Sequence, residues 1–94
     1  QLQMLFEWDE RKRLANITKH RIDFEDAWLV LGDAFMRLPA RSVGDELRYR
    51  AIGYVRRNLV AIVYTMRGET FRIISMRKAR DDERRLYDQE VQSR

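Results

Sequence analysis

Three strand-length runs that follow one another with very short connections constrain the fold most. The runs are LRYRAIGYV, LVAIVYTM and ETFRIISM, at residues 47–55, 59–66 and 69–76. The connections between them, RRN and RG, are too short for anything but a tight turn. Short connections make consecutive strands antiparallel neighbours, so the sequence predicts a β-meander. The second run is apolar on both faces, which is typical of a central strand.

The segment before the meander predicts one strand and two helices. MLFEW, residues 4–8, alternates as a half-buried strand does, and Asp9 is placed to cap a helix that ends near His20, with Leu14 and Ile17 as its apolar stripe. A second helix is expected between Asp23 as N-cap and Gly32 as C-cap. The linker that follows holds the only proline and predicts a short edge strand at residues 35–38. Both tryptophans, Trp8 and Trp28, are expected in the core.

A last helix is predicted from about Arg80 to Val91, because acidic residues occupy its first turn, where the helix dipole favours them. Leu86 and Val91 give this helix only a thin apolar stripe. The whole pattern predicts an α+β fold. In this fold an antiparallel sheet is covered on one face by the two N-terminal helices, and the basic residues of the meander occupy the other face.

Size and composition limit the possible classes of protein. Ninety-four residues are expected to form one domain, 1–94, and there is no cysteine, which excludes disulfides and thiolate metal sites. No apolar run approaches the roughly 20 residues that span a bilayer, and the N-terminus does not resemble a signal peptide. We therefore expect a cytoplasmic protein without membrane association. Met4 would serve as a native start, which would make Gln1–Gln3 an extension.

The positive charge is concentrated in one segment. The net charge is +4, but residues 47–80 alone hold nine basic residues and one acidic residue. The flanking segments, 1–46 and 81–94, are each slightly acidic. Such a concentration indicates a polyanionic partner. Most of these basic residues are arginines, whose planar fork binds phosphate oxygens in pairs.

Most standard catalytic sets are missing from the sequence. One histidine and no cysteine exclude thiol nucleophiles and two-histidine catalysis. They also argue against a zinc site, which needs several nitrogen or sulfur ligands, and the four glycines form no phosphate-binding loop. The remaining arginine, lysine, tyrosine and carboxylate residues can still cleave RNA. RNA carries its own nucleophile, the 2′-hydroxyl, so a protein need only align it and stabilise charge on the phosphoryl oxygens. A non-catalytic basic module that binds nucleic acid, or an acidic protein, is the alternative.

Arg72, Arg77 and Lys78 could supply this charge stabilisation, and Tyr87, Glu83 or His20 could move a proton. Each of these residues also has a purely structural interpretation. Arg72 is as consistent with a position on a solvated strand face as with a position in a site. Glu83 is consistent with an ordinary acidic residue in the first turn of a helix. Tyr87 is equally consistent with packing against the sheet, and His20 with a helix end. Arg77 and Lys78 favour function more strongly, because no acidic residues balance the charge around them.

Two long motifs resemble those of the BrnT family, the toxins of bacterial type II toxin–antitoxin pairs. The motifs are FEWDERKRLANITKHRIDFEDA at the front and RIISMRKARDDERRLY near the end. The resemblance spans residues 6–87 in order, and its positions are Phe6–Asp9, Lys12, Asn16, Lys19, His20, Phe24, Glu25, Ala27, Arg48, Ile52, Gly53, Thr65, Arg67, Arg72–Ser75, Arg77, Glu83, Arg84 and Tyr87.

The resemblance implies a RelE-like fold, a ribonuclease that arrests translation, and no metal or cofactor. It implies a cognate BrnA-like antitoxin that forms a hetero-oligomer with the toxin, with two or more copies of each chain, and that contacts DNA through its own domain. Together with the charge pattern, it makes Arg72, Arg77, Glu83 and Tyr87 the candidate catalytic residues. The candidate RNA-binding residues are Lys12, His20, Arg48 and Lys78.

The chain departs from the family pattern at three turns or caps. Arg21 stands where a glycine usually follows Lys-His, so a positive φ there would be strained. Arg57–Asn58 replaces a common hairpin glycine, and asparagine tolerates a left-handed conformation. Arg80 stands where the last helix often has a threonine or serine cap. None of these changes touches the candidate catalytic residues.

Overall fold

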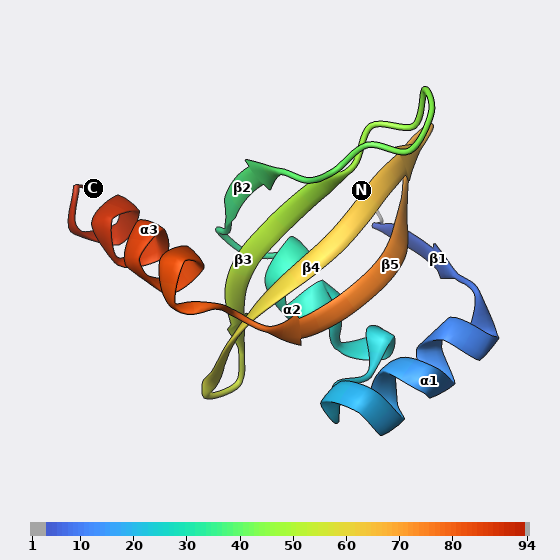
Figure 1. Ribbon diagram of the computed structural model, residues 1–94, viewed down its shortest axis with the longest axis horizontal. Coiled ribbons are helices and arrows are strands. Elements are labelled where there is room, and N and C mark those ends of the chain that lie inside the picture. The colour runs from blue at the N-terminus through green and yellow to red at the C-terminus, as the bar shows by residue number, and fades with distance from the viewer. Residues whose placement is uncertain (1–3, 94) are drawn as a thin grey trace.

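The structure, a computed structural model, describes residues 4–93, and the expectation about Gln1–Gln3 lies outside them. Across these residues a five-stranded sheet has the order β1-β5-β4-β3-β2 (Figure 1). Its strands are β1 (Leu5–Trp8), β2 (Met36–Pro39), β3 (Tyr49–Val55), β4 (Asn58–Arg67) and β5 (Thr70–Lys78). The meander of β3, β4 and β5 is confirmed, and the predicted central strand, β4, lies in the middle. The predicted edge strand is β2, which lies at residues 36–39 and not 35–38.

The prediction of an antiparallel sheet is wrong at one edge. β1 pairs with β5 in parallel, with Leu5 opposite Thr70 and Trp8 opposite Ile73. A short connection fixes the relative direction of consecutive strands only. β1 and β5 are separated by most of the chain, including the first helices, so no turn dictates their relative direction. The sheet is therefore mixed, with one parallel pair and three antiparallel pairs.

The predicted second helix is divided into two short pieces. α1 (Glu10–His20) is followed by the 3-10 helix η1 (Phe24–Asp26) and by α2 (Trp28–Leu31). Asp23 caps η1 as expected, because its side chain accepts a hydrogen bond from the N–H of Glu25 at 2.9 Å. In a 3-10 turn residues i and i+3 lie on the same side. This turn buries Phe24 and Ala27 together, each 1% exposed.

The two tryptophans have different environments. Trp8 is half-buried and packs against the main core, with its ring edge-on to Phe24 at a centroid distance of 6.2 Å. Trp28 is 58% exposed, so its predicted place in the core is wrong. The residue before it, Ala27, faces the core, and the helical turn that starts there directs Trp28 outwards.

A buried polar side chain attaches α1 to the sheet. Leu14 is exposed, contrary to its predicted place in an apolar stripe, and Asn16 is the buried residue of the helix. The Asn16 side-chain amide donates to the carbonyls of Met76 at 2.8 Å and Ile22 at 3.0 Å, and its Oδ1 accepts from the N–H of Met76 at 3.2 Å. Asn16 thus joins α1 to the end of β5 and to the segment that enters η1.

A bulge explains why the sequence of β5 alternates poorly. The register between β4 and β5 shifts at Val63 and Tyr64, so that Val63 faces Ser75 while Tyr64 faces Ile73. The extra residue, Ile74, allows Ile73 and Met76 to enter the same core despite their spacing of three. Arg72, Ser75 and Arg77 are thereby left on the other face of the sheet.

The two faces of the sheet are covered differently. η1 and α2 pack on the face that holds the main core, behind the sheet in Figure 1. On the opposite face packs α3 (Asp81–Gln92), which leaves the sheet at the end of β5 (Figure 1). Tyr87 packs there against a small cluster of Met36, Ile52, Leu59 and Ala61, whereas the predicted stripe residues Leu86 and Val91 are exposed. No helix within residues 4–93 is long and apolar enough to span a membrane.

Candidate functional site

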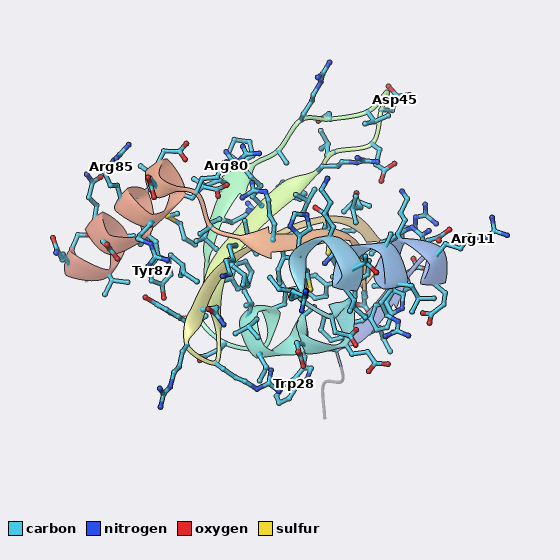
Figure 2. All side chains as sticks on the ribbon, turned by 60° about the horizontal axis from the view of Figure 1, so that its bottom comes forward. Arg11, Trp28, Asp45, Arg80, Arg85 and Tyr87 are labelled. Atoms are coloured by element: carbon cyan, nitrogen blue, oxygen red, sulfur yellow. The ribbon has the colours of Figure 1, made fainter. Side chains whose placement is uncertain are left out.

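An arginine-lined groove occupies the sheet face opposite α2, beside the start of α3. Its volume is about 420 Å³. Figure 2 shows Arg80 on this side of the sheet and Trp28 on the other. Among residues 4–93, ten line the groove; half of them are arginines and none is acidic: Pro39, Ala40, Arg41, Arg48, Arg50, Val63, Ile74, Ser75, Arg77 and Arg80. We call this site the arginine groove.

Strand alternation assembles the groove. Arg50 on β3 and Ser75 on β5 lie on either side of Val63 in the central strand. Arg48 precedes Arg50 by two residues and Arg77 follows Ser75 by two, so all four side chains share one face. The short apolar side chain of Val63 leaves space between the two basic strands. The groove is thus a direct consequence of the register across β3, β4 and β5.

Glu83 lies beneath the groove as a fully buried carboxylate, 0% exposed. Arg77 donates to both of its oxygens, from Nη1 at 2.7 Å and from Nη2 at 2.9 Å. Arg50 Nη1 donates to Glu83 Oε2 at 2.8 Å, and the backbone N–H of Arg80 donates to Oε1 at 2.9 Å. One side chain in the first turn of α3 therefore fixes two guanidinium groups, one from each side of the groove.

These hydrogen bonds also fix the charge of Glu83. Burial alone would raise its pKa, but the hydrogen bonds from Arg77, the Arg80 N–H and Arg50 outweigh burial and lower the pKa to about 2. The hydrogen bond to Glu83 likewise raises the pKa of Arg77. At neutral pH the carboxylate is therefore ionised. Such a carboxylate is suited to positioning the arginines and is poorly suited to exchanging a proton with a substrate.

The remaining arginines of the groove are less tightly paired. Arg48 Nε is 3.8 Å from Glu46 Oε1, and it is a buried nitrogen without a hydrogen-bond partner within residues 4–93. Arg41 and Arg80 are exposed at the rim. Fixed guanidinium groups with unsatisfied N–H donors are well matched to phosphate oxygens, which accept paired hydrogen bonds.

Three of the predicted site residues meet at this groove. Arg48 and Arg77 line it, and Glu83 lies beneath it. Arg72 is on the same face but outside the lining, where its Nη1 lies 3.5 Å from Glu7 Oε2. Lys78 is exposed and pairs across the sheet with Val60, a core residue, so it belongs to the other face. Adjacent strand residues such as Arg77 and Lys78 cannot both enter the groove.

The other predicted site residues do not line the groove. Lys12 is exposed on α1, and His20 is half-buried at the end of that helix. Tyr87 packs in the small cluster under α3, with its ring edge-on to Tyr54 at a centroid distance of 5.7 Å. The structure therefore does not bring these three residues together with Arg77.

Arg41, Arg50, Ser75 and Arg80 line the groove but were not among the predicted site residues. A sequence signal existed for Arg50, because it follows Arg48 by two residues in a predicted strand and must share its face. No comparable signal existed for Arg41, which lies in the loop between β2 and β3. Ser75 was obscured by the bulge at Ile74.

The fold and the groove define a small α+β protein whose exposed sheet face is suited to bind the phosphate backbone of a nucleic acid. The model of a known family, described as "Ribonuclease toxin, BrnT, of type II toxin-antitoxin system", matches residues 8–83. The chain therefore belongs to the BrnT family of ribonuclease toxins, which confirms the resemblance seen in the sequence.

A solved structure supports the same assignment. The chain is similar to the ribonuclease toxin BrnT of Brucella abortus, whose crystal structure was determined at 1.1 Å resolution. The two share 31% sequence identity with a TM-score of 0.63, and the match covers 84% of this chain and all of the other. Comparison with curated proteins finds no match.

Proposed function

We propose that this chain is a metal-independent endoribonuclease that arrests translation and that the arginine groove is its active site. The observation that carries the proposal is the convergence of five arginines on one groove without an acidic lining residue. A strand of RNA is the polyanion that this arrangement suits, since each phosphate presents oxygens to the paired N–H groups of an arginine. Family membership favours RNA over other polyanions.

In this proposal the 2′-hydroxyl of RNA attacks the adjacent phosphorus, and the bond from phosphorus to the 5′-oxygen breaks. The products are a 2′,3′-cyclic phosphate and a 5′-hydroxyl, so the proton lost by the 2′-oxygen is balanced by one gained by the 5′-oxygen. Arg50 and Arg77 stabilise the charge on the phosphoryl oxygens. Glu83 is a positioning residue that holds both guanidinium groups. Preorganised donors of this kind typically contribute about 10²–10³ in rate each.

The remaining candidates take secondary roles. The lining side chains are arginines, one serine and apolar residues, so we assign the proton exchange to water in the open groove. Arg48 contacts a neighbouring phosphate, and Arg72 extends the basic face along β5. Tyr87, Lys12 and His20 lie outside the groove and are not assigned to the chemical step.

The proposed partner is a BrnA-like antitoxin, because a type II toxin is neutralised by a protein. An antitoxin that covers the arginine groove would block RNA and would need acidic residues to match five arginines. We propose that the two chains form a hetero-oligomer in the cytoplasm and that the toxin meets DNA only through the antitoxin.

The test is incubation of purified, antitoxin-free protein with labelled total RNA in EDTA, followed by analysis of fragment ends. The proposal predicts fragments with 2′,3′-cyclic or 3′-phosphate ends and no dependence on divalent metal. Intact RNA that nonetheless shifts on a gel would favour a binding module without chemistry, or cleavage that needs the ribosome. Repeating the assay with translating ribosomes separates those two outcomes.

A further inference from the structure

A second pocket lies on the other side of α3 from the arginine groove. It has a volume of about 270 Å³ and is lined by Tyr54 of β3 and by Tyr87, Asp88, Val91 and Gln92 of α3. Tyr54 is 45% exposed, although it belongs to a strand that is otherwise largely buried. The Tyr54 and Tyr87 rings meet at 78°, so they form an aromatic corner and not a stack. Figure 2 shows Tyr87 beneath α3, away from Arg80.

Helical spacing divides the α3 side of this pocket into two stripes. Tyr87 and Val91 are four residues apart and form an apolar stripe, and Asp88 and Gln92 form a polar stripe beside it. Asp88 and Gln92 are exposed, and neither side chain makes a hydrogen bond or ion pair with the rest of residues 4–93. The pocket thus offers an aromatic and aliphatic surface next to an exposed carboxylate and an exposed amide.

This combination matches an unpaired nucleobase, and we infer that the pocket binds a guanine of the RNA substrate. The inference rests on the proposed function. Single-stranded RNA is generally read by stacking bases on aromatic side chains and by hydrogen bonds to their Watson–Crick edges. Guanine presents two neighbouring donors, N1–H and N2–H, to which a carboxylate can accept in parallel. Gln92 supplies an amide donor for the guanine O6.

The position of the pocket relative to the groove supports this assignment. Arg50, Ile52 and Tyr54 alternate along β3 and so share one face. Arg50 lines the groove, Ile52 lies under α3, and Tyr54 lines the pocket. Tyr54 is four residues from Arg50, which is about 13 Å along a strand. Because α3 covers Ile52 between the two sites, an RNA strand that holds a phosphate in the groove reaches the pocket by passing over this helix.

The test measures binding of labelled 2′-O-methyl oligonucleotides, which lack the free 2′-hydroxyl and cannot be cleaved by the proposed chemistry. The set is UUGUU, UUAUU and the inosine version UUIUU, and the readout is fluorescence anisotropy. The wild-type chain is expected to bind UUGUU about tenfold more tightly than UUAUU, as for a good bidentate contact. Inosine keeps N1–H but lacks the N2 amino group, so UUIUU should fall between them.

The Asp88→Asn variant replaces one acceptor oxygen with a donor and should lose the preference for UUGUU while binding UUAUU as before. Glu90→Gln is the matched control, since it removes the same charge from α3 outside the pocket, and it should keep the preference. Equal wild-type affinities for UUGUU and UUAUU, or a preference that survives in Asp88→Asn, would overturn the inference while RNA cleavage remained intact. Failure to bind any of the oligonucleotides at low salt would overturn the proposed function as well.

Discussion

Glu83 Oε1 lies 2.7 Å from Arg77 Nη1, and this contact joins the first turn of α3 to the end of β5. Arg50 Nη1 reaches the other oxygen of the same carboxylate from β3, at 2.8 Å. The start of α3 and both basic strands of the groove are therefore connected through one buried side chain. This connection couples the stability of the fold to the geometry of the proposed active site.

Replacing Glu83 with alanine should lower the free energy of unfolding by about 3 kcal/mol, because two partly buried guanidinium groups lose their counter-charge. Urea denaturation measures this change. Asp88→Ala, an exposed acid of the same helix without a partner among the described residues, should stay within about 0.5 kcal/mol of wild type. Equal losses in the two variants would show that Glu83 has no special structural role.

Stability should fall in acid, and Glu83 should account for much of that fall. Its folded-state pKa, about 2, lies below the unfolded value of 4.5. A lowered pKa means that the stabilisation is fully present above pH 4.5 and is lost as the pH drops towards 2. Unfolding free energies measured from pH 6 to pH 2.5 should therefore decrease steeply in wild type. Glu83→Gln should be less stable at pH 6 and show a flatter curve, whereas parallel curves would contradict the assigned pKa.

Arg48 gives a test of phosphate binding that leaves the Glu83 contacts intact. Arg48→Gln should weaken binding of single-stranded RNA and reduce the slope of log affinity against log salt by about 0.7, the value for one phosphate contact. Arg11→Gln, an exposed change on α1, removes the same charge away from the groove. If both variants alter the salt slope equally, the groove does not select phosphate.

The left-handed backbone at Arg21 predicts a stabilising substitution. Arg21 caps α1 with φ of 61°, a conformation that costs an ordinary residue about 1–2 kcal/mol. Arg21→Gly should therefore raise the unfolding free energy by roughly 1 kcal/mol. Ala15→Gly, at an exposed position inside the same helix, should lower it by about 1 kcal/mol. Thermal unfolding of the two variants should shift in opposite directions, and a shared loss would mean that Arg21 is not strained.

Local rules in the sequence predicted most elements of the fold, but not the division of the second helix into η1 and α2 and not all of the long-range contacts. Turn lengths and alternation predicted the meander, and the expected strain at Arg21 is present as a positive φ. In the hairpin between β3 and β4, where Arg57–Asn58 replaces a common glycine, the left-handed residue is Arg56 and not Asn58. The parallel partner of β1 and the burial of Asn16 depend on which distant strand lies beside them. No periodicity within residues 4–20 contains that information.

The site was only partly predictable for a similar reason. Once the strands are assigned, alternation places the side chains of Arg77 and Lys78 on opposite faces of the sheet. It places those of Arg48 and Arg50 on the same face. The burial of Glu83 could not be read from its position, since an acid in the first turn of a helix is ordinarily exposed and stabilised by the dipole. Its contacts with Arg50 and Arg77 depend on the sheet order, which places β3 and β5 on either side of β4.

The central claim is that the guanidinium of Arg77, held by Glu83, stabilises a phosphate at the point of cleavage. The most direct measurement compares single-turnover RNA cleavage by wild type and by Arg77→Lys in EDTA. Lysine keeps the charge and can still pair with Glu83, but it lacks the planar fork. The account predicts a rate at least about tenfold lower in a variant that still folds. An unchanged cleavage rate in a folded Arg77→Lys variant would contradict it.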